Sequence, residues 1–265
     1  RPYRCPPPAR APWIRAAKSA WWIWGAGVTL MFMLVLIMLA PVYLAPLFNS
    51  YTPMQEGPLK TEILHMAQAN GVPASDVSVF DVSRQSNRVT ANVSGFAGTT
   101  RIALSDTLIQ RASTDGVREV MGHEIGHYVL RHTSSILVML GVLIAFAFAF
   151  THLLFGWIAR GERWGVRAIS DPAGMPLFFA ILTFLFTVAA PVQNNIIRYH
   201  EHQADIFGLN ASRAPDGFAE TALLLSEYRK MSPGPLELWA FYDHPSGYQR
   251  IRMAMDWKAH EMAAG

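Results

Sequence analysis

Three long uncharged runs dominate the pattern of polar and apolar positions. The first lies between Lys18 and Glu56 and is most apolar over residues 21–45, and the others cover residues 133–159 and 172–197. Each run exceeds the ~20 residues that a helix needs to cross a membrane. A buried core helix is the alternative for each run, but one soluble domain rarely holds three of this length. The pattern therefore predicts three transmembrane helices.

The first run differs from a cleaved signal peptide. It is too long, and it opens with Trp21, Trp22 and Trp24, which are typical of the aromatic belt at a membrane surface. Residues 1–20 are predicted to form a basic N-terminal loop, which has no initiator methionine. We therefore expect the chain to be a fragment that lacks upstream segments.

Three spans place the polar segments 46–132 and 198–265 on one side of the membrane. The loop at 160–171 then lies on the other side, together with residues 1–20. Because basic residues favour the cytoplasmic side, the basic N-terminal loop predicts that both polar segments lie outside the cytoplasm.

The segment 46–132 alternates between helical and strand patterns. Thr90, Asn92 and Ser94 alternate with apolar neighbours, as in a half-exposed strand. Thr114 or Asp115 is a candidate cap for the helix that follows. The predicted elements are a helix over 59–69, strands over 77–82, 88–93 and 101–104, a helix over 106–111, and a longer helix that starts near Val117. These elements predict a small α+β unit.

Composition agrees with a membrane protein and narrows the chemistry. Only 15% of the residues are charged, against about 25% in a typical soluble domain. The isoelectric point is near 9.1, but no basic run with interleaved aromatic residues supports nucleic-acid binding. The single cysteine, Cys5, excludes an internal disulfide and a cysteine-based zinc site.

Residues 123–127 carry the strongest chemical signal, His-Glu-Ile-Gly-His. On a helix, His123 and His127 lie on one face and can direct two imidazole nitrogens at one Zn²⁺. Glu124 is then placed to take a proton from a water molecule at the metal. The alternative is a pair of ordinary helix histidines.

Two histidines and a water leave a zinc ion one protein ligand short, and Glu often fills that place. Glu201 is the best candidate, because it follows the third span and returns to the membrane side of His123. Asp205, one helical turn later, can accept the outer N–H of a zinc-bound histidine. Arg198, one turn earlier, can pair with either carboxylate. The alternative is a solvated charged turn at a membrane exit.

The remaining histidines are weaker candidates. His200 and His202 point about 100° to either side of Glu201 on a helix, so neither is predicted to be a ligand. His132 lies off the ligand face and is predicted to be interfacial. His152, inside the second span, is expected to be a satisfied contact between helices.

A later loop carries His244-Pro245, followed by Arg250. Hydrolysis of a peptide by an activated water builds an oxyanion, which a cationic or N–H donor stabilises. His244 or Arg250 is predicted to supply that donor. A helix-capping His-Pro turn is an equal alternative.

Taken together, the chain resembles the integral-membrane zinc metalloproteases of the CAAX prenyl protease type 1 family, including their bacterial relatives. The order and spacing of the matching blocks over residues 20–255 are more specific than any one motif. The blocks are the tryptophan-opened span ending in Ala45-Pro46-Leu47-Phe48-Asn49, the stretch 101–108, Met121-Gly122-His123-Glu124-Ile125-Gly126-His127, two spans, Glu201-His202-Gln203-Ala204-Asp205, and His244-Pro245 with Arg250-Ile251.

The resemblance implies a zinc endopeptidase whose centre faces a chamber enclosed by seven membrane helices, of which this chain holds the last three. It implies one Zn²⁺ per chain, with His123, His127 and Glu201 as ligands and Glu124 as general base. It also implies an edge strand that binds the substrate backbone, with Asn92 as a substrate contact. The eukaryotic Asn-Ala-aromatic pattern of that strand is absent here, so membrane-associated peptides are expected beside CAAX-type ones.

The predicted fold class is mainly α and membrane-embedded: transmembrane helices with a small α+β zincin-like unit. Its catalytic parts are 46–132, with the HExxH helix, and 198–265, with the third zinc ligand. We expect a multi-pass protein of a bacterial inner membrane, whose partners are peptide substrates and the lipid bilayer.

Two other functions stay open. One is a heat-shock-type quality-control membrane metalloprotease, and the other is a catalytically silent metal-binding membrane protein. The side of the membrane is also open, because the resemblance implies a cytoplasmic zinc site.

Overall fold

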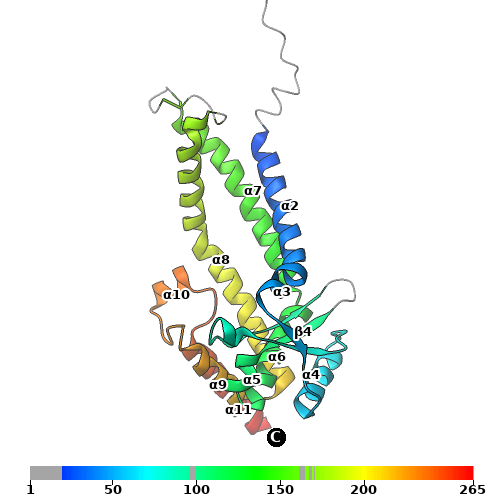
Figure 1. The fold of residues 1–265 in the computed structure, drawn as a ribbon. Coiled ribbons are helices and arrows are strands. Elements are labelled where there is room, and N and C mark those ends of the chain that lie inside the picture. The colour runs from blue at the N-terminus through cyan, green and yellow to red at the C-terminus, as the bar shows by residue number, and fades with distance from the viewer. Residues whose placement is uncertain (1–19, 96–99, 161–164, 167–168, 170, 265) are drawn as a thin grey trace, which may run out of the picture. The chain divides into compact units, whose positions relative to one another are not determined.

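The structure is a computed structural model that describes residues 20–95, 100–160, 165–166, 169 and 171–264 (Figure 1). Cys5 and nearly all of the predicted basic loop lie outside these residues. The chain divides into two compact units. One comprises the described residues up to Ile37 together with Val138–Ala189, and the other comprises Met38–Leu137 together with the described residues from Ala190 onward.

Parts of three long apolar helices make up most of the first unit. Three helices of the described chain are long and apolar enough to cross a membrane: Trp21–Leu39, His132–Ile158 and Pro172–Ser212. They correspond to α2 (Trp21–Leu39), α7 (His132–Ile158), and the short 3₁₀ turn η3 (Pro172–Gly174) with α8 (Met175–Ser212). Trp21 donates its indole N–H to Nδ1 of His152 at 3.0 Å. His152 is therefore a satisfied contact between α2 and α7, as predicted.

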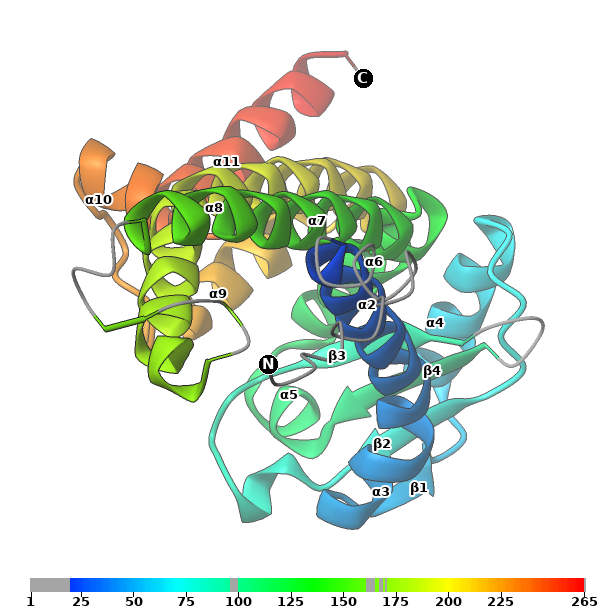
Figure 2. The same cartoon turned by 90° about the horizontal axis from the view of Figure 1, so that it is seen from above.

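The helical path that starts with α2 continues into the second unit through a π-helical turn, η1 (Ala40–Leu44), and α3 (Ala45–Phe48). A four-stranded sheet follows, with the order β1-β2-β4-β3 (Figure 2). β2 and β4 are parallel, and the edge strands β1 and β3 pair antiparallel to them. The strands are β1 (Tyr51–Pro53), β2 (Val77–Phe80), β3 (Ala91–Ser94) and β4 (Arg101–Ser105).

Helices pack on this sheet and on one another. The hydrophobic core lies between β2, β3, β4 and three helices, and it includes the fully buried side chains Ile63, Ile102 and Met121. The elements of this unit besides the strands and α8 are α4 (Pro58–Ala69), η2 (Val82–Arg84), α5 (Asp106–Arg111), α6 (Thr114–Val129), α9 (Pro215–Leu225), α10 (Pro235–Phe241) and α11 (Gly247–Ala264). Because α6 belongs to this core, the helix of the His-Glu-Ile-Gly-His motif is held firmly.

Several boundaries differ from the sequence prediction, and β2 ends at Phe80 rather than at residue 82. The helix α6 begins at Thr114 rather than near Val117, and its cap is Ser113, whose Oγ accepts the N–H of Gly116 at 3.1 Å. Thr114 and Asp115 already lie inside the first turn, where the Asp115 charge favours the positive end of the helix. The strand predicted over 88–93 is β3 (Ala91–Ser94), whose register with β4 starts with the pair Ala91 and Leu104.

The third predicted span does not end as a helix at Ile197. The helix α8 runs on to Ser212 and carries Glu201 and Asp205 on its last turns. Glu201 and Asp205 therefore lie one turn apart on the same helix, which directs both carboxylates to the same side.

Candidate metal centre

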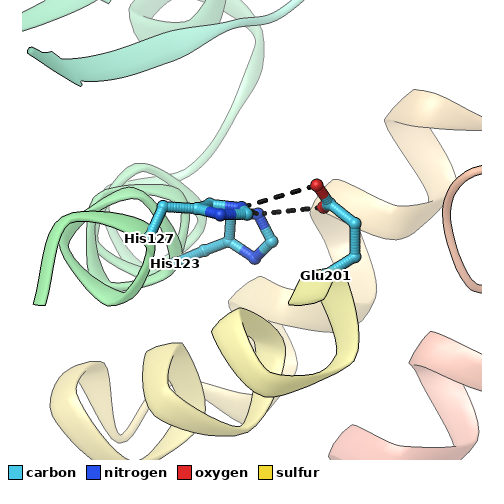
Figure 3. Close-up of side chains that lie close together, drawn as sticks. All are labelled: His123, His127 and Glu201. Atoms are coloured by element: carbon cyan, nitrogen blue, oxygen red, sulfur yellow. Dashed lines mark hydrogen bonds and ion pairs between the residues drawn. The ribbon is translucent and has the colours of Figure 1, made fainter. Parts of the chain in front are cut away.

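The structure brings the three predicted ligands together (Figure 3). His123 and His127 lie one turn apart on α6, and Glu201 lies on α8. The two Nε2 atoms are 3.0 Å apart, and the Glu201 carboxylate oxygens lie 3.4 and 3.5 Å from them. A tetrahedral ion with bonds of ~2.0–2.2 Å holds neighbouring ligand atoms about 3.3 Å apart. The three side chains therefore fit a metal ion.

Two glycines let α6 and α8 approach closely at this point. A Cβ atom added to Gly122 would lie 3.0 Å from the carbonyl oxygen of Gly208. A Cβ atom added to Gly208 would lie 2.9 Å from the backbone nitrogen of His123. The glycine next to the first histidine is thus needed for the distance between the two ligand-bearing helices.

The outer nitrogen of His123 faces a buried ion pair. Nδ1 of His123 lies 2.8 Å from Oδ1 of Asp205, whose side chain is fully buried. Arg250 is also buried, and its Nε donates to Oδ2 of Asp205 at 3.0 Å while its Nη2 donates to Oδ1. This chain of contacts fixes the orientation of the His123 ring, so that its Nε2 points to Glu201.

A cavity of about 460 Å³ opens beside the ligand group, and Glu124 and His244 line it together with His123 and Glu201. Nε2 of His244 lies 3.2 Å from a Glu201 oxygen, and its Nδ1 lies 2.7 Å from Oδ1 of Asp243. A carboxyl group and an imidazole therefore share one cavity with the candidate metal site.

The electrostatics of the site favour a positive charge between the ligands. Burial opposes a charged imidazole, but the carboxylates of Asp205 and Glu201 outweigh it and raise the pKa of His123 well above its ordinary value. Burial also raises the pKa of the Glu124 carboxyl, against the nearby histidines. A carboxyl whose pKa moves toward neutrality is better suited to accept and return a proton.

Comparisons with known proteins agree with this geometry. The model of peptidase family M48 matches residues 53–258. The chain belongs to peptidase family M48. It is 27% identical over 245 residues to the uncharacterized metalloprotease YhfN of Bacillus subtilis. That alignment covers 91% of this chain and 58% of the relative. It is 32% identical over 246 residues to the CAAX prenyl protease 1 homolog of Oryza sativa, covering 89% of this chain and 55% of that relative.

A solved structure shares the fold of this M48 chain. The crystal structure of Ste24p from S. mikatae superposes with a TM-score of 0.73 at 26% identity, over 86% of this chain and 58% of that one. The predicted family and the predicted fold class are therefore confirmed, and the prediction of a metalloprotease is confirmed at the level of the family. Family membership and the His-His-Glu group also indicate a metal ion. The chain spans somewhat more than half the length of these relatives.

Arg198 lies elsewhere than predicted for this M48 site. Its guanidinium donates to the carbonyl oxygens of Leu238 and Tyr242 at 2.6 and 2.7 Å. Leu238 lies in the last turn of α10 and Tyr242 directly follows the helix, where the helix dipole favours a cation. Arg198 therefore holds the segment that leads to His244, and Arg250 takes the carboxylate predicted for Arg198.

The other two differences concern Arg250 and Asn92. Arg250 was one of two candidates for the oxyanion, but two of its nitrogens donate to Asp205. Asn92 lies on the edge strand β3, yet the residues of this segment that line the cavity are Arg88, Val89, Thr90 and Ala91. The Asn92 carboxamide oxygen instead accepts from Ser94 Oγ at 3.3 Å.

Sequence reasoning missed two groups near the M48 metal site. Glu119, one turn before His123 on α6, is buried, and its Oε1 has no hydrogen-bond partner among the described residues. His132 was predicted to be interfacial, but it is 3% exposed and contacts His127. The prediction for His132 failed because α6 ends at Val129 and the chain turns through Arg131, whose φ is 56°, before α7 begins. Helical spacing therefore does not apply across this turn.

Proposed function

We propose that this chain is the metal-binding part of a membrane-embedded zinc endopeptidase that acts on membrane-associated or CAAX-type peptides. The observation that carries the proposal is the convergence of His123, His127 and Glu201 beside a cavity that Glu124 also lines. Two imidazoles and one carboxylate in tetrahedral spacing are typical of catalytic zinc sites that keep one position open.

Each residue of the site has a different role in the proposed hydrolysis. A bound zinc ion would acidify a water molecule and polarise the substrate carbonyl. Glu124 takes the proton of that water and returns it to the departing amine. His244, which faces the ligand group, donates to the carbonyl oxygen as negative charge develops there. Asp205 and Arg250 hold the ring of His123, so their effect on the reaction is indirect.

The edge strand suggests how a substrate lies. On its free side, β3 has no strand partner among the described residues, and the residues just before it line the cavity. An extended peptide would pair antiparallel with the segment around residues 88–91 through main-chain hydrogen bonds, a mode that reads little sequence. We propose these residues, in place of Asn92, as the backbone contact of the substrate.

The names of the relatives support the proposed substrate class, and the apolar helices support the proposed membrane location. Relatives called CAAX prenyl protease 1 favour CAAX-type peptides among the substrates. We propose a multi-pass protein of a bacterial inner membrane: the three apolar helices support several spans, and the relative in Bacillus subtilis supports a bacterial source.

Metal analysis and one isosteric substitution test the proposal. We expect about one zinc per chain in detergent-purified protein, and its loss in Glu201→Ala. Glu124→Gln should keep the zinc and lose the hydrolysis of a fluorogenic peptide. Glu261→Gln, at an exposed position of α11, is the matched control and should behave as the wild type.

Each outcome has a consequence. Hydrolysis that survives Glu124→Gln would refute the mechanism. A fully zinc-loaded wild type that cleaves no peptide would instead favour the catalytically silent metal-binding protein.

A further inference from the structure

The two histidines of the ligand group are supported in different ways. Nδ1 of His123 faces the carboxylate of Asp205. Nδ1 of His127 instead faces another imidazole, because Nδ1 of His132 lies 3.0 Å away. The rings of His127 and His132 meet edge to face, with centroids 5.0 Å apart and planes at 77°. Such a geometry suits an N–H that points from one ring at the lone pair of the other.

The position of the ligand atom decides the direction of this hydrogen bond. Nε2 of His127 is the atom that lies near His123 and Glu201. A neutral imidazole that offers Nε2 as a lone pair carries its proton on Nδ1. Nδ1 of His127 is therefore the donor, and Nδ1 of His132 must be the acceptor.

His132 is itself held in place from the side of α8. The ring of His200 stacks on it, with centroids 4.6 Å apart and planes at 23°. His200 is buried, and its Nε2 lies 3.1 Å from Oγ of Ser135, on the same turn of α7 as His132. His200 directly precedes Glu201, so α8 supplies both the third ligand and the support of the second histidine.

We propose that His132 is the positioning residue for His127, which it holds in the tautomer and ring orientation that present Nε2 to the metal. This inference rests on the proposed metal site. A carboxylate partner makes a ligand histidine more basic, whereas an uncharged imidazole accepts the hydrogen bond without adding charge. The pair of ligands is thus asymmetric, with a charged support behind His123 and a neutral one behind His127.

Two substitutions of His132 separate its acceptor from its bulk. His132→Phe keeps a ring against His200 but removes the acceptor. His132→Asn gives up ring area but can place its carboxamide oxygen where Nδ1 stood. The measurement is the zinc dissociation constant from competition with a chromophoric chelator, together with thermal unfolding of the metal-free proteins. The absorption bands of the cobalt-substituted proteins report the geometry of the ligands.

We expect His132→Phe to bind zinc about 10- to 100-fold more weakly, the range for lost support behind a metal-bound histidine, and to shift the cobalt bands. His132→Asn should retain most of the affinity, although its metal-free form unfolds at a temperature no higher than that of His132→Phe. A purely packing role predicts the opposite order.

Wild-type affinity in His132→Phe, or equal losses in both variants, would overturn the proposal. If His132→Phe does not fold, His132→Asn decides alone, because a 10-fold loss there would contradict the role of the acceptor. Failure of the proposed metal site is recognised separately: the wild type and Glu201→Ala would then contain the same amount of zinc.

Discussion

Replacing Gly208 by alanine should separate the two ligand-bearing helices. The added Cβ would lie 2.9 Å from the backbone nitrogen of His123 and 3.2 Å from its Cα. Ordinary contacts begin at about 3.4 Å, so α6 and α8 must move apart by about 0.5 Å. Backbone atoms cannot rotate away as a flexible side chain can, so the strain falls on the helix positions.

The energetic cost follows from two opposing terms. Overpacking of this kind costs about 1–3 kcal/mol, whereas alanine in place of glycine inside a helix gains about 1 kcal/mol. The matched control is Gly156→Ala in α7, where the new Cβ meets nothing within 4 Å. The difference in unfolding free energy between the two variants should therefore equal the overpacking cost, about 1–3 kcal/mol.

Metal binding should respond more sharply than stability. A site tolerates displacements of about 0.5 Å before its geometry fails, and His123 moves with α6 while Glu201 moves with α8. We expect zinc to bind about tenfold more weakly to Gly208→Ala, in the range that disturbed ligand orientation produces. Chelator competition and thermal unfolding of the metal-free protein measure both effects. If Gly208→Ala matched Gly156→Ala in both, the close approach of the helices would be irrelevant to the site.

Three further substitutions test other parts of the site. Asp205→Asn should weaken zinc binding about 10- to 100-fold, and an unchanged dissociation constant would contradict its role behind His123. Burial raises the pKa of Glu119 from 4.5 to about 7. The folded state therefore holds this proton more tightly and loses stability as the pH rises from 4.5 to 7. Glu119→Gln should thus match the wild type in thermal unfolding near pH ~4.5 and exceed it above pH ~7 by up to about 3 kcal/mol, and an equal gain at both pH values would argue against this origin. Arg198→Ala should cost about 1.5–3 kcal/mol of stability and slow peptide hydrolysis, whereas Arg252→Ala, which breaks an exposed ion pair, should change little.

The sequence predicts the parts of this protein that depend on local spacing. His123 and His127 lie four residues apart on one helix, so their shared face follows from helical geometry. Glu201 was found by the chemistry of the missing ligand and by the topology of the spans. The helices α4 and α5 and the strand β4 follow from residue pattern and turn residues, to within one residue.

Contacts across turns and between distant segments escape such reasoning. His132 meets His127 only because Arg131 adopts a positive φ. Arg250 meets Asp205 from 45 residues away, and no local pattern distinguishes it from Arg198. In the sequence, Glu119 is an ordinary helix residue. Its burial follows only from the packing of α8 on α6. The sequence alone also does not show that Gly208 is important, because its role depends on the close approach of α6.

The positions of the three ligands in the sequence also determine when the metal site can form during synthesis. Glu201 follows His127 by 74 residues (201 − 127), and α7 and the apolar part of α8 lie between them. During synthesis, a chain that has just completed α6 offers only two of the three ligands that a catalytic zinc site needs. The candidate metal site therefore cannot be complete before α8 has been synthesised and has packed on α6.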